Sequence, residues 1–221
     1  HTYDVTRYLR PDSNTIAVWY APCPQATAYS QNAASKQLTL DYYGTSHNGS
    51  AFYQQADESW SCSLSEGNRI TQDSIGNTIE VFDNRQYDNN WKASDFFFQE
   101  SEKPVHRLLK ETKGIYTTLP TYPAYGNRLR HVLSPIAEYE DSLGLHYDFG
   151  RFFQGSVRIT LREAKKGERL EINGLVYICS GEMDEQAFRR LSTSRQKSIT
   201  IKGDRHFRKS QIQKIEGLEI Y

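Results

Sequence analysis

The sequence predicts an all-β protein built from two antiparallel β-sandwich units, with few short helices. Short runs of four to eight residues alternate apolar and polar side chains, and each run is bounded by Gly, Asn, Asp, Ser or Pro. Aromatic residues make up 13% of the chain, with 15 Tyr and 10 Phe against a single Met, and such side chains favour strands. Helical periodicity is scarce, because no long amphipathic stripe occurs.

The alternating runs place strands in both halves of the chain. The expected strands are Asn14–Tyr20, Lys36–Gly44, Asn77–Asn84, Ser156–Glu163, Glu168–Gly174, Leu175–Gly181, Lys197–Gly203 and Glu216–Tyr221. One segment, Asp184–Gln196, follows a helical pattern instead, with Ala187, Phe188 and Leu191 on one stripe after an acidic cap. We therefore expect a helix of two or three turns there.

A change of composition divides the chain. The segment Thr112–Arg128 carries two Pro, two Gly and three Tyr between the two strand-rich halves. We interpret it as a junction and expect one unit over residues 1–118 and a second over 119–221. A long crossing loop within a single sandwich would have the same composition.

The charge balance and the cysteines exclude several classes of protein. The chain has 27 basic and 27 acidic residues, so it lacks the positive charge of a nucleic-acid binder. No apolar run approaches the roughly 20 residues of a membrane-spanning helix. The three cysteines, Cys23, Cys62 and Cys179, form no CxxC pair and are expected to be buried free thiols, with one disulfide bridge among them as the alternative. The chain begins at His1 without an initiator Met or apolar leader, as a segment of a longer protein would.

No catalytic centre is predicted from the residues. The six histidines show no metal-binding spacing, and no Gly-x-Ser-x-Gly or phosphate-binding glycine loop occurs. Two acidic clusters, 138–141 and 182–185, lie in polar segments where carboxylates are usually solvated turn or cap residues. We therefore predict no catalytic residue, no metal site and no cofactor.

Several segments together resemble bacterial α-L-rhamnosidases. Residues 3–20, "YDVTRYLRPDSNTIAVWY", resemble a galactose-binding-like jelly roll found beside many glycoside hydrolases. Asp57–Trp60, Phe82–Arg85 and Trp91 then occur in the order of the jelly roll that opens the rhamnosidases. The elements of "SPIAEYEDSLGLHYDFGRFFQGSVRITLREAKKGERLEI" resemble the concanavalin-like sandwich that follows it. The chain departs from the family at Arg151–Phe152, where Gln-Asn is usual, and in its last residues.

The resemblance implies a non-catalytic role for this chain. The enzymes hydrolyse terminal α-L-rhamnose with inversion, using acidic residues of a helical barrel that has no counterpart here. An inverting pair of carboxyl groups lies roughly 6.5–9.5 Å apart. We expect the chain alone to be inactive, with a helical catalytic domain of the same polypeptide and a rhamnose-containing glycan as its partners. A bacterial enzyme of this kind would be periplasmic or secreted. The alternatives are an autonomous carbohydrate-binding module and a purely structural domain.

The candidate binding residues follow one expected strand. Asp83, Arg85, Asp88 and Trp91 combine the side chains that pair with sugar hydroxyls and the ring that stacks on a sugar face. Two other interpretations remain open. An Asp–Arg pair could instead fix a loop to the rim of the sandwich while Trp91 fills the core, and this is the favoured interpretation. A calcium-binding loop of Asp83, Asp88 and Asn89 would lack the regular ligand spacing of such loops.

Overall fold

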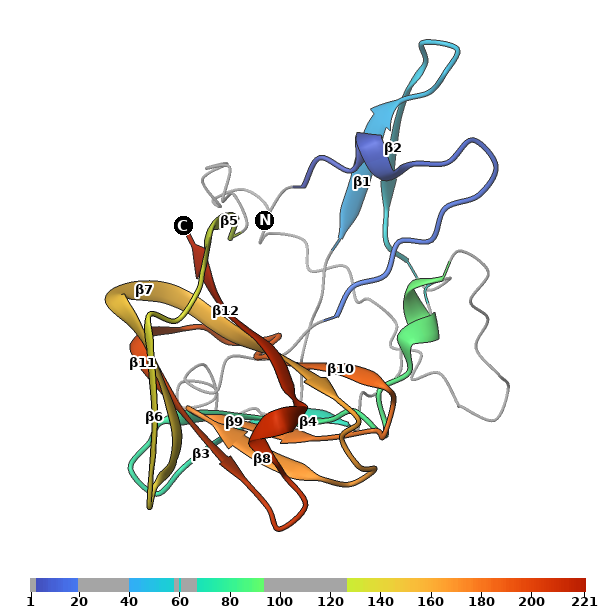
Figure 1. The fold of residues 1–221 in the computed structure, drawn as a ribbon. Coiled ribbons are helices and arrows are strands. Elements are labelled where there is room, and N and C mark those ends of the chain that lie inside the picture. Colours follow the sequence, from blue (N-terminus) through green and yellow to red (C-terminus); the bar gives the residue numbers. More distant parts are fainter. Residues whose placement is uncertain (1–2, 20–39, 58–59, 61–66, 94–126) are drawn as a thin grey trace.

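The protein is all-β, as the sequence predicts. The structure, a computed structural model, describes residues 3–19, 40–57, 60, 67–93 and 127–221 (Figure 1). β1 (Asp41–Thr45) and β2 (Ala51–Gln55) form a separate antiparallel hairpin, and ten strands form one hydrogen-bonded sheet. In the described ranges, helical structure is confined to the 3₁₀ turns η1 (Thr6–Tyr8), η3 (Asn89–Lys92) and η4 (Lys209–Gln211).

The ten strands follow the order β3-β4-β9-β8-β11-β7-β12-β5, with β6 and β10 also paired to β7. Their bounds are β3 (Asn68–Gln72), β4 (Thr78–Asp83), β5 (Leu129–Leu133), β6 (Ala137–Asp141), β7 (Gly144–Arg162), β8 (Arg169–Ile172), β9 (Leu175–Ile178), β10 (Asp184–Ala187), β11 (Ser194–Gly203) and β12 (Ile212–Ile220).

The 19-residue strand β7 belongs to both faces of the fold. Its first residues, 144–148, pair with β6 on one side and β11 on the other. Its last residues, 155–162, pair with β12 and β10. Figure 1 shows β7 curving strongly between these two halves. One continuous strand therefore connects the two layers of the sandwich.

Glycines make this bend possible. Gly150 and Gly155 have φ of 77° and 157°, where residues with a side chain are strained. A methyl group on Gly155 would also overlap the carbonyl oxygen of Leu218 on β12. Opposite the bend, the pairing of β11 shifts its register between Gln196 and Ser198. A bulge and a glycine are the usual means of bending a strand at a sheet corner.

The core lies between the layers and follows the alternation of β7. Every second residue from Leu145 to Phe149, and again from Val157 to Leu161, is buried. Facing strands contribute the remaining apolar side chains, among them Ile172, Tyr177 and Ile201. Burying one such side chain contributes about 1.5–3 kcal/mol relative to leaving it in water. This shared core makes the position of each strand depend on its neighbours.

The hairpin β3–β4 belongs to the same sheet as the later strands. β4 pairs in parallel with β9, from Glu80 opposite Leu175 to Asp83 opposite Ile178. The expected division into units at residues 118 and 119 lies outside the described residues and stays a prediction. Backbone hydrogen bonds nevertheless connect strands from both sides of it.

The helix expected at Asp184–Gln196 is wrong. Asp184–Ala187 is β10, in which Glu185 and Ala187 face inward, and β11 begins at Ser194. The intervening segment is held by the buried carboxylate of Glu80, which accepts hydrogen bonds from the backbone N–H groups of Arg190 and Leu191 at 2.8 and 3.1 Å. These tertiary bonds satisfy backbone groups that a helix would have satisfied internally, so they outweigh the local periodicity.

The other expected elements have mixed outcomes. The strands predicted around 77–84, 156–163, 168–174, 175–181, 197–203 and 216–221 are confirmed as β4, β7, β8, β9, β11 and β12. Residues 14–19 form no strand, although Trp19 packs against the core. The expected strand at 36–44 is described only from residue 40 on, where β1 begins at Asp41. Cys179 is a buried free thiol, as expected, whereas Cys23 and Cys62 lie outside the described residues.

We expect Gly155→Ala to lower the free energy of unfolding by at least about 2 kcal/mol, because the methyl group adds a clash to a strained backbone. Gly76 is the matched control, since its φ is 85° but its surroundings are empty within 4 Å. Gly76→Ala should cost only about 1 kcal/mol, the backbone strain alone. Equal losses for the two variants in urea unfolding would contradict this account of the bend.

Glu80→Gln should lower the free energy of unfolding by about 2–4 kcal/mol. The NH₂ group of the new amide cannot accept the hydrogen bonds that one carboxylate oxygen of Glu80 accepts. Glu182→Gln on the exposed turn before β10 is the control and should change it by less than about 0.5 kcal/mol. Urea unfolding followed by tryptophan fluorescence measures both. A negligible loss for Glu80→Gln would mean that the segment 188–192 is held by other contacts.

Candidate functional site

Asp83 and Arg85 form an ion pair at the end of β4. Asp83 is buried, and its two carboxylate oxygens accept hydrogen bonds from Nε and Nη2 of Arg85 at 2.9 and 2.7 Å. The backbone N–H of Arg85 also donates to Asp83. These bonds to Arg85 hold the pKa of Asp83 below its ordinary value, although burial opposes the shift. The sequence placed these residues together correctly, and the structure shows that they bind each other.

Asp88 precedes the short turn η3, and Trp91 lies within it. The carboxylate of Asp88 caps this turn by accepting a hydrogen bond from the backbone N–H of Asn90 at 2.8 Å. The indole N–H of Trp91 donates to the hydroxyl of Tyr87 at 3.1 Å. The half-buried ring of Trp91 therefore points toward the protein rather than standing free as a platform.

An aromatic cluster underlies this loop. The ring of Tyr87 packs at 5.4 Å from Trp19 and at 5.2 Å from Phe82, and Trp91 meets Trp19 edge-on at 6.2 Å. The guanidinium of Arg190 lies 4.5 Å from the Phe82 ring centre and 5.0 Å from that of Tyr87. Aromatic pairs and cation–π contacts of this kind contribute about 0.5–1.5 kcal/mol each.

Sequence reasoning missed the partners of this cluster. Trp19 and Arg190 lie far from Tyr87 along the chain, so only the pairing of β4 with β9 and the fold of the segment after β10 bring them together. Tyr87 itself carried a signal, because it stands between the two acidic residues of the predicted site. The Asp83–Arg85 pair fits the loop-fixing interpretation, whereas Trp91 is only partly buried and packs on Trp19 at the edge of the core rather than within it.

Few hydrogen-bonding groups of the predicted site are left for a ligand. Asp83 is occupied by Arg85, Asp88 by the backbone, and Trp91 by Tyr87. Carbohydrate contact by Asp83, Arg85, Asp88 and Trp91 stays a prediction, and a sugar would have to compete with these bonds. Among the described residues, no group of three or more His, Cys, Asp or Glu side chains could hold a metal ion.

The buried carboxylates nearby also have structural partners. Glu185 accepts hydrogen bonds from the Tyr177 hydroxyl at 3.1 Å and the Asn84 side chain at 2.9 Å, and from the backbone N–H groups of Ser180 and Gly181. Contact with Glu185, after burial itself, raises the pKa of Tyr177. Glu80 and Glu185 thus use their oxygens to connect β4, β9 and β10, and neither faces an open cleft.

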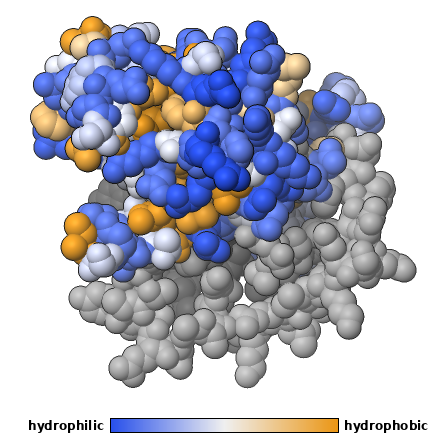
Figure 2. Space-filling view, turned by 60° about the horizontal axis from the view of Figure 1, so that its bottom comes forward, coloured by the Kyte–Doolittle hydropathy of each residue, from blue (hydrophilic) through white to orange (hydrophobic). Residues whose placement is uncertain are grey.

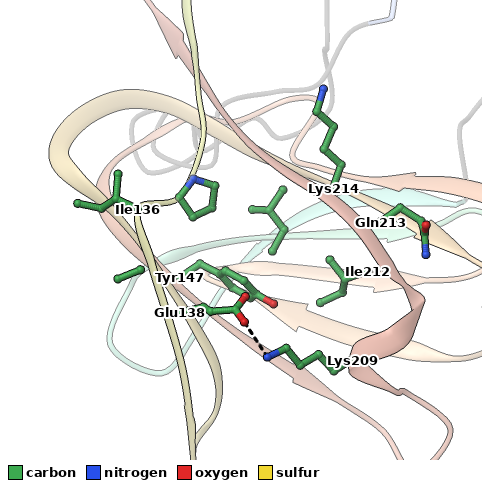
Figure 3. A pocket seen from close by; sticks show the side chains of 10 residues that line it. Ile136, Glu138, Tyr147, Lys209, Ile212, Gln213 and Lys214 are labelled. Atoms are coloured by element: carbon green, nitrogen blue, oxygen red, sulfur yellow. Dashed lines mark hydrogen bonds and ion pairs between the residues drawn. The ribbon is translucent and has the colours of Figure 1, made fainter.

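Two hollows in the described part of the surface lie away from this loop. One, of about 430 Å³, lies between the start of β6 and the start of β12, where Glu138 and Lys209 form an ion pair of 2.9 Å (Figure 3). The other, of about 290 Å³, lies beside Thr200 and Asn173. Figure 2 shows a mostly hydrophilic face with separate apolar areas between the charged side chains.

A hydrogen-bonded chain adjoins the smaller hollow. His146 contacts Asp141 through Nε2 at 2.8 Å and the Thr200 hydroxyl through Nδ1 at 3.1 Å, while Tyr139 stacks on its ring at 4.5 Å. The order Thr–His–Asp is that of a nucleophile, a base and an orienting acid. Thr200 lies in the middle of β11, however, and the amide of Asn173 beside it is already bonded to the backbone of Thr200 and Ser198. The amide of Asn173 is therefore not free to donate to an oxyanion beside Thr200.

Comparison with solved structures finds similar folds in α-L-rhamnosidases. The α-L-rhamnosidase from Dictyoglumus thermophilum matches with a TM-score of 0.60 and 22% identity, over 82% of this chain and 22% of the enzyme. The Streptomyces avermitilis α-L-rhamnosidase, solved in complex with L-rhamnose, matches with a TM-score of 0.54 and 14% identity, over 81% of this chain and 18% of the enzyme.

The fold resembles a region of these enzymes. The chain spans about a fifth of their length, so most of each enzyme has no counterpart in it. No protein-family model and no curated protein matches the sequence. Within the described ranges, no helix has the length and apolar character needed to cross a membrane.

The Asp83–Arg85 pair predicts a pH dependence. Because the pKa of Asp83 is lowered in the folded state, the stability it contributes is present above about pH 4 and is lost as the pH falls further. Asp83→Asn should therefore destabilise the protein at pH 7 and have a smaller effect at pH 2. Urea unfolding at both pH values measures the difference, and Arg85→Ala should show the same trend. A pH-independent difference would contradict the role of the charged pair.

Proposed function

We propose that this chain is a non-catalytic β-sandwich region of an α-L-rhamnosidase-like glycoside hydrolase. The observation that carries the proposal is the fold likeness, which covers most of this chain but only about a fifth of the two enzymes. The order of the sequence segments that resemble bacterial α-L-rhamnosidases supports the same assignment independently of the fold.

The carboxylates of the described residues support a non-catalytic role. An inverting glycosidase needs one carboxylic acid to protonate the leaving oxygen and one carboxylate to activate water across a cleft. The buried acids here are held instead by backbone N–H groups or by arginines, as Glu80 and Glu185 are, and as Glu216 is by Arg158 at 2.7 Å. A carboxylate that already accepts several hydrogen bonds is a poor proton donor or base.

The role of the chain would then be to support a helical catalytic domain of the same polypeptide. The stiff, hydrogen-bonded sheet around β7 suits that role, because a catalytic cleft must be held to within about 0.5 Å of its productive geometry. The substrates would be rhamnose-containing glycans, and the enzyme would act in the periplasm or outside the cell.

We expect the purified 221-residue chain not to hydrolyse an aryl α-L-rhamnoside, whereas the native protein that contains it should do so. The native protein can be recovered from its source with an antibody raised against the chain. Its mass should exceed that of the chain by several hundred residues, and NMR of the first product should show inverted, β-configured rhamnose.

Two outcomes would contradict the proposal. Turnover by the 221-residue chain that persists through successive purification steps would place catalytic groups within the sandwich. A native protein without rhamnosidase activity would remove the link to these enzymes. A variant of the chain with both Arg158→Ala and Lys214→Ala is a useful control. It frees Glu216 from both cationic partners, so an activity that depended on this carboxylate would rise.

A further inference from the structure

The larger hollow, which we call the β6–β12 wedge, lies where the chain passes from β5, which pairs with β12, to β6, which pairs with β7. β5 pairs with β12 only through Gly217–Ile220, and the chain then reaches Pro135, which has no N–H to continue that pairing. The next residue, Ile136, donates its backbone N–H to Asp148 on β7 at 2.8 Å. The start of β12 is therefore left without a described strand on that side.

The wedge has apolar walls and a polar floor. Ile136, which is 75% exposed, and Ile212 line opposite sides, as Figure 3 shows. The ring of Tyr147 lies between them, and its hydroxyl end is directed toward Ile212 and the Glu138–Lys209 pair. A volume of about 430 Å³ lies within the range of small-ligand sites.

The hydroxyl of Tyr147 is the feature that indicates a ligand. Tyr147 is 6% exposed, yet no described residue accepts or donates a hydrogen bond at its hydroxyl. Burial, with a smaller effect from Glu138, raises the pKa of Tyr147, so the group keeps its proton and can donate. The hydroxyl oxygen is open to solvent in the hollow, so a hydroxyl group of a ligand can bond to it without displacing a protein partner.

The charges at the rim select a neutral ligand. Glu138 and Lys209 neutralise each other, and Lys214 is paired with Glu216 at 2.6 Å. An ion pair can nevertheless hold two adjacent hydroxyl groups, because one donates to the carboxylate while the other accepts from the ammonium group. The ligand should therefore be uncharged and carry several hydroxyl groups.

We propose that the β6–β12 wedge binds one 6-deoxyhexose unit of a glycan, with its methyl group between Ile136 and Ile212 and a ring hydroxyl on Tyr147. Such a sugar combines an apolar methyl group with neighbouring hydroxyls and has no charge. Its identity as L-rhamnose rests on the proposed function. The wedge would hold the glycan by a region that performs no hydrolysis.

Titration of the ¹⁵N-labelled chain with L-rhamnose, followed by NMR, tests the proposal. Saturable shifts are expected at the backbone amides of residues 136–138, 147 and 209–215. L-mannose, which has a hydroxyl on C6, should bind at least about fivefold more weakly. Its C6 hydroxyl would give up its hydrogen bonds to water and find no partner between the two isoleucines.

Tyr147→Phe removes one hydroxyl and keeps the packing, so it should weaken binding about tenfold without unfolding the chain. Tyr139→Phe is the matched control, because Tyr139 lies on β6 but stacks on His146 outside the wedge. Its affinity should equal that of the unchanged chain. Circular dichroism of each variant shows that it is folded.

Three results would overturn the proposal: no saturable binding, shifts centred on Arg85 and Trp91 instead of the wedge, or equal affinity after Tyr147→Phe. Tighter binding of L-fucose, another 6-deoxyhexose, than of L-rhamnose would overturn only the identity of the sugar as L-rhamnose. The proposed function is tested separately, by the rhamnosidase activity of the native protein. A native protein that hydrolyses rhamnosides while the wedge binds no sugar would contradict only this inference.

Discussion

The fold depends on the backbone hydrogen bonds of β7. This strand pairs with β6 and β11 over its first half and with β12 and β10 over its second, so four strands take their positions from it. A strand shared by two layers must bend, and Gly150 and Gly155 provide backbone conformations that other residues adopt only with strain. The same bend separates β6 from β12 and so creates the wedge at Tyr147.

Buried carboxylates perform a second connecting task. Glu80 holds the backbone after β10, and Glu185 joins β9, β10 and the residue that follows β4. A buried carboxylate is stable only when hydrogen bonds replace its lost water, and here backbone N–H groups supply many of them. Within the described residues, the oxygens of Glu80 and Glu185 are thus used to hold the strands together, which supports the proposed non-catalytic role.

The predicted site illustrates what local sequence can indicate. The Asp83–Arg85 pair could be predicted, because two residues of opposite charge separated by one position can meet at a strand end. The aromatic cluster could not, because Trp19, Tyr87 and Arg190 are brought together by strand pairing across long separations. The wedge could not be predicted either: Glu138 is an exposed acid, as its polar segment indicates, and nothing near it along the chain indicates Lys209 or Ile212.

The sequence by itself determined the strands whose alternation was regular and the all-β class, since these follow from the side chains of short segments. Only the tertiary structure decided that Asp184–Ala187 is a strand, that β7 continues through Gly150 and Gly155, and that β4 pairs with β9. In each case the deciding hydrogen bonds join residues distant along the chain. Local periodicity cannot encode such partners, because a backbone group is satisfied equally well by a near or a remote acceptor.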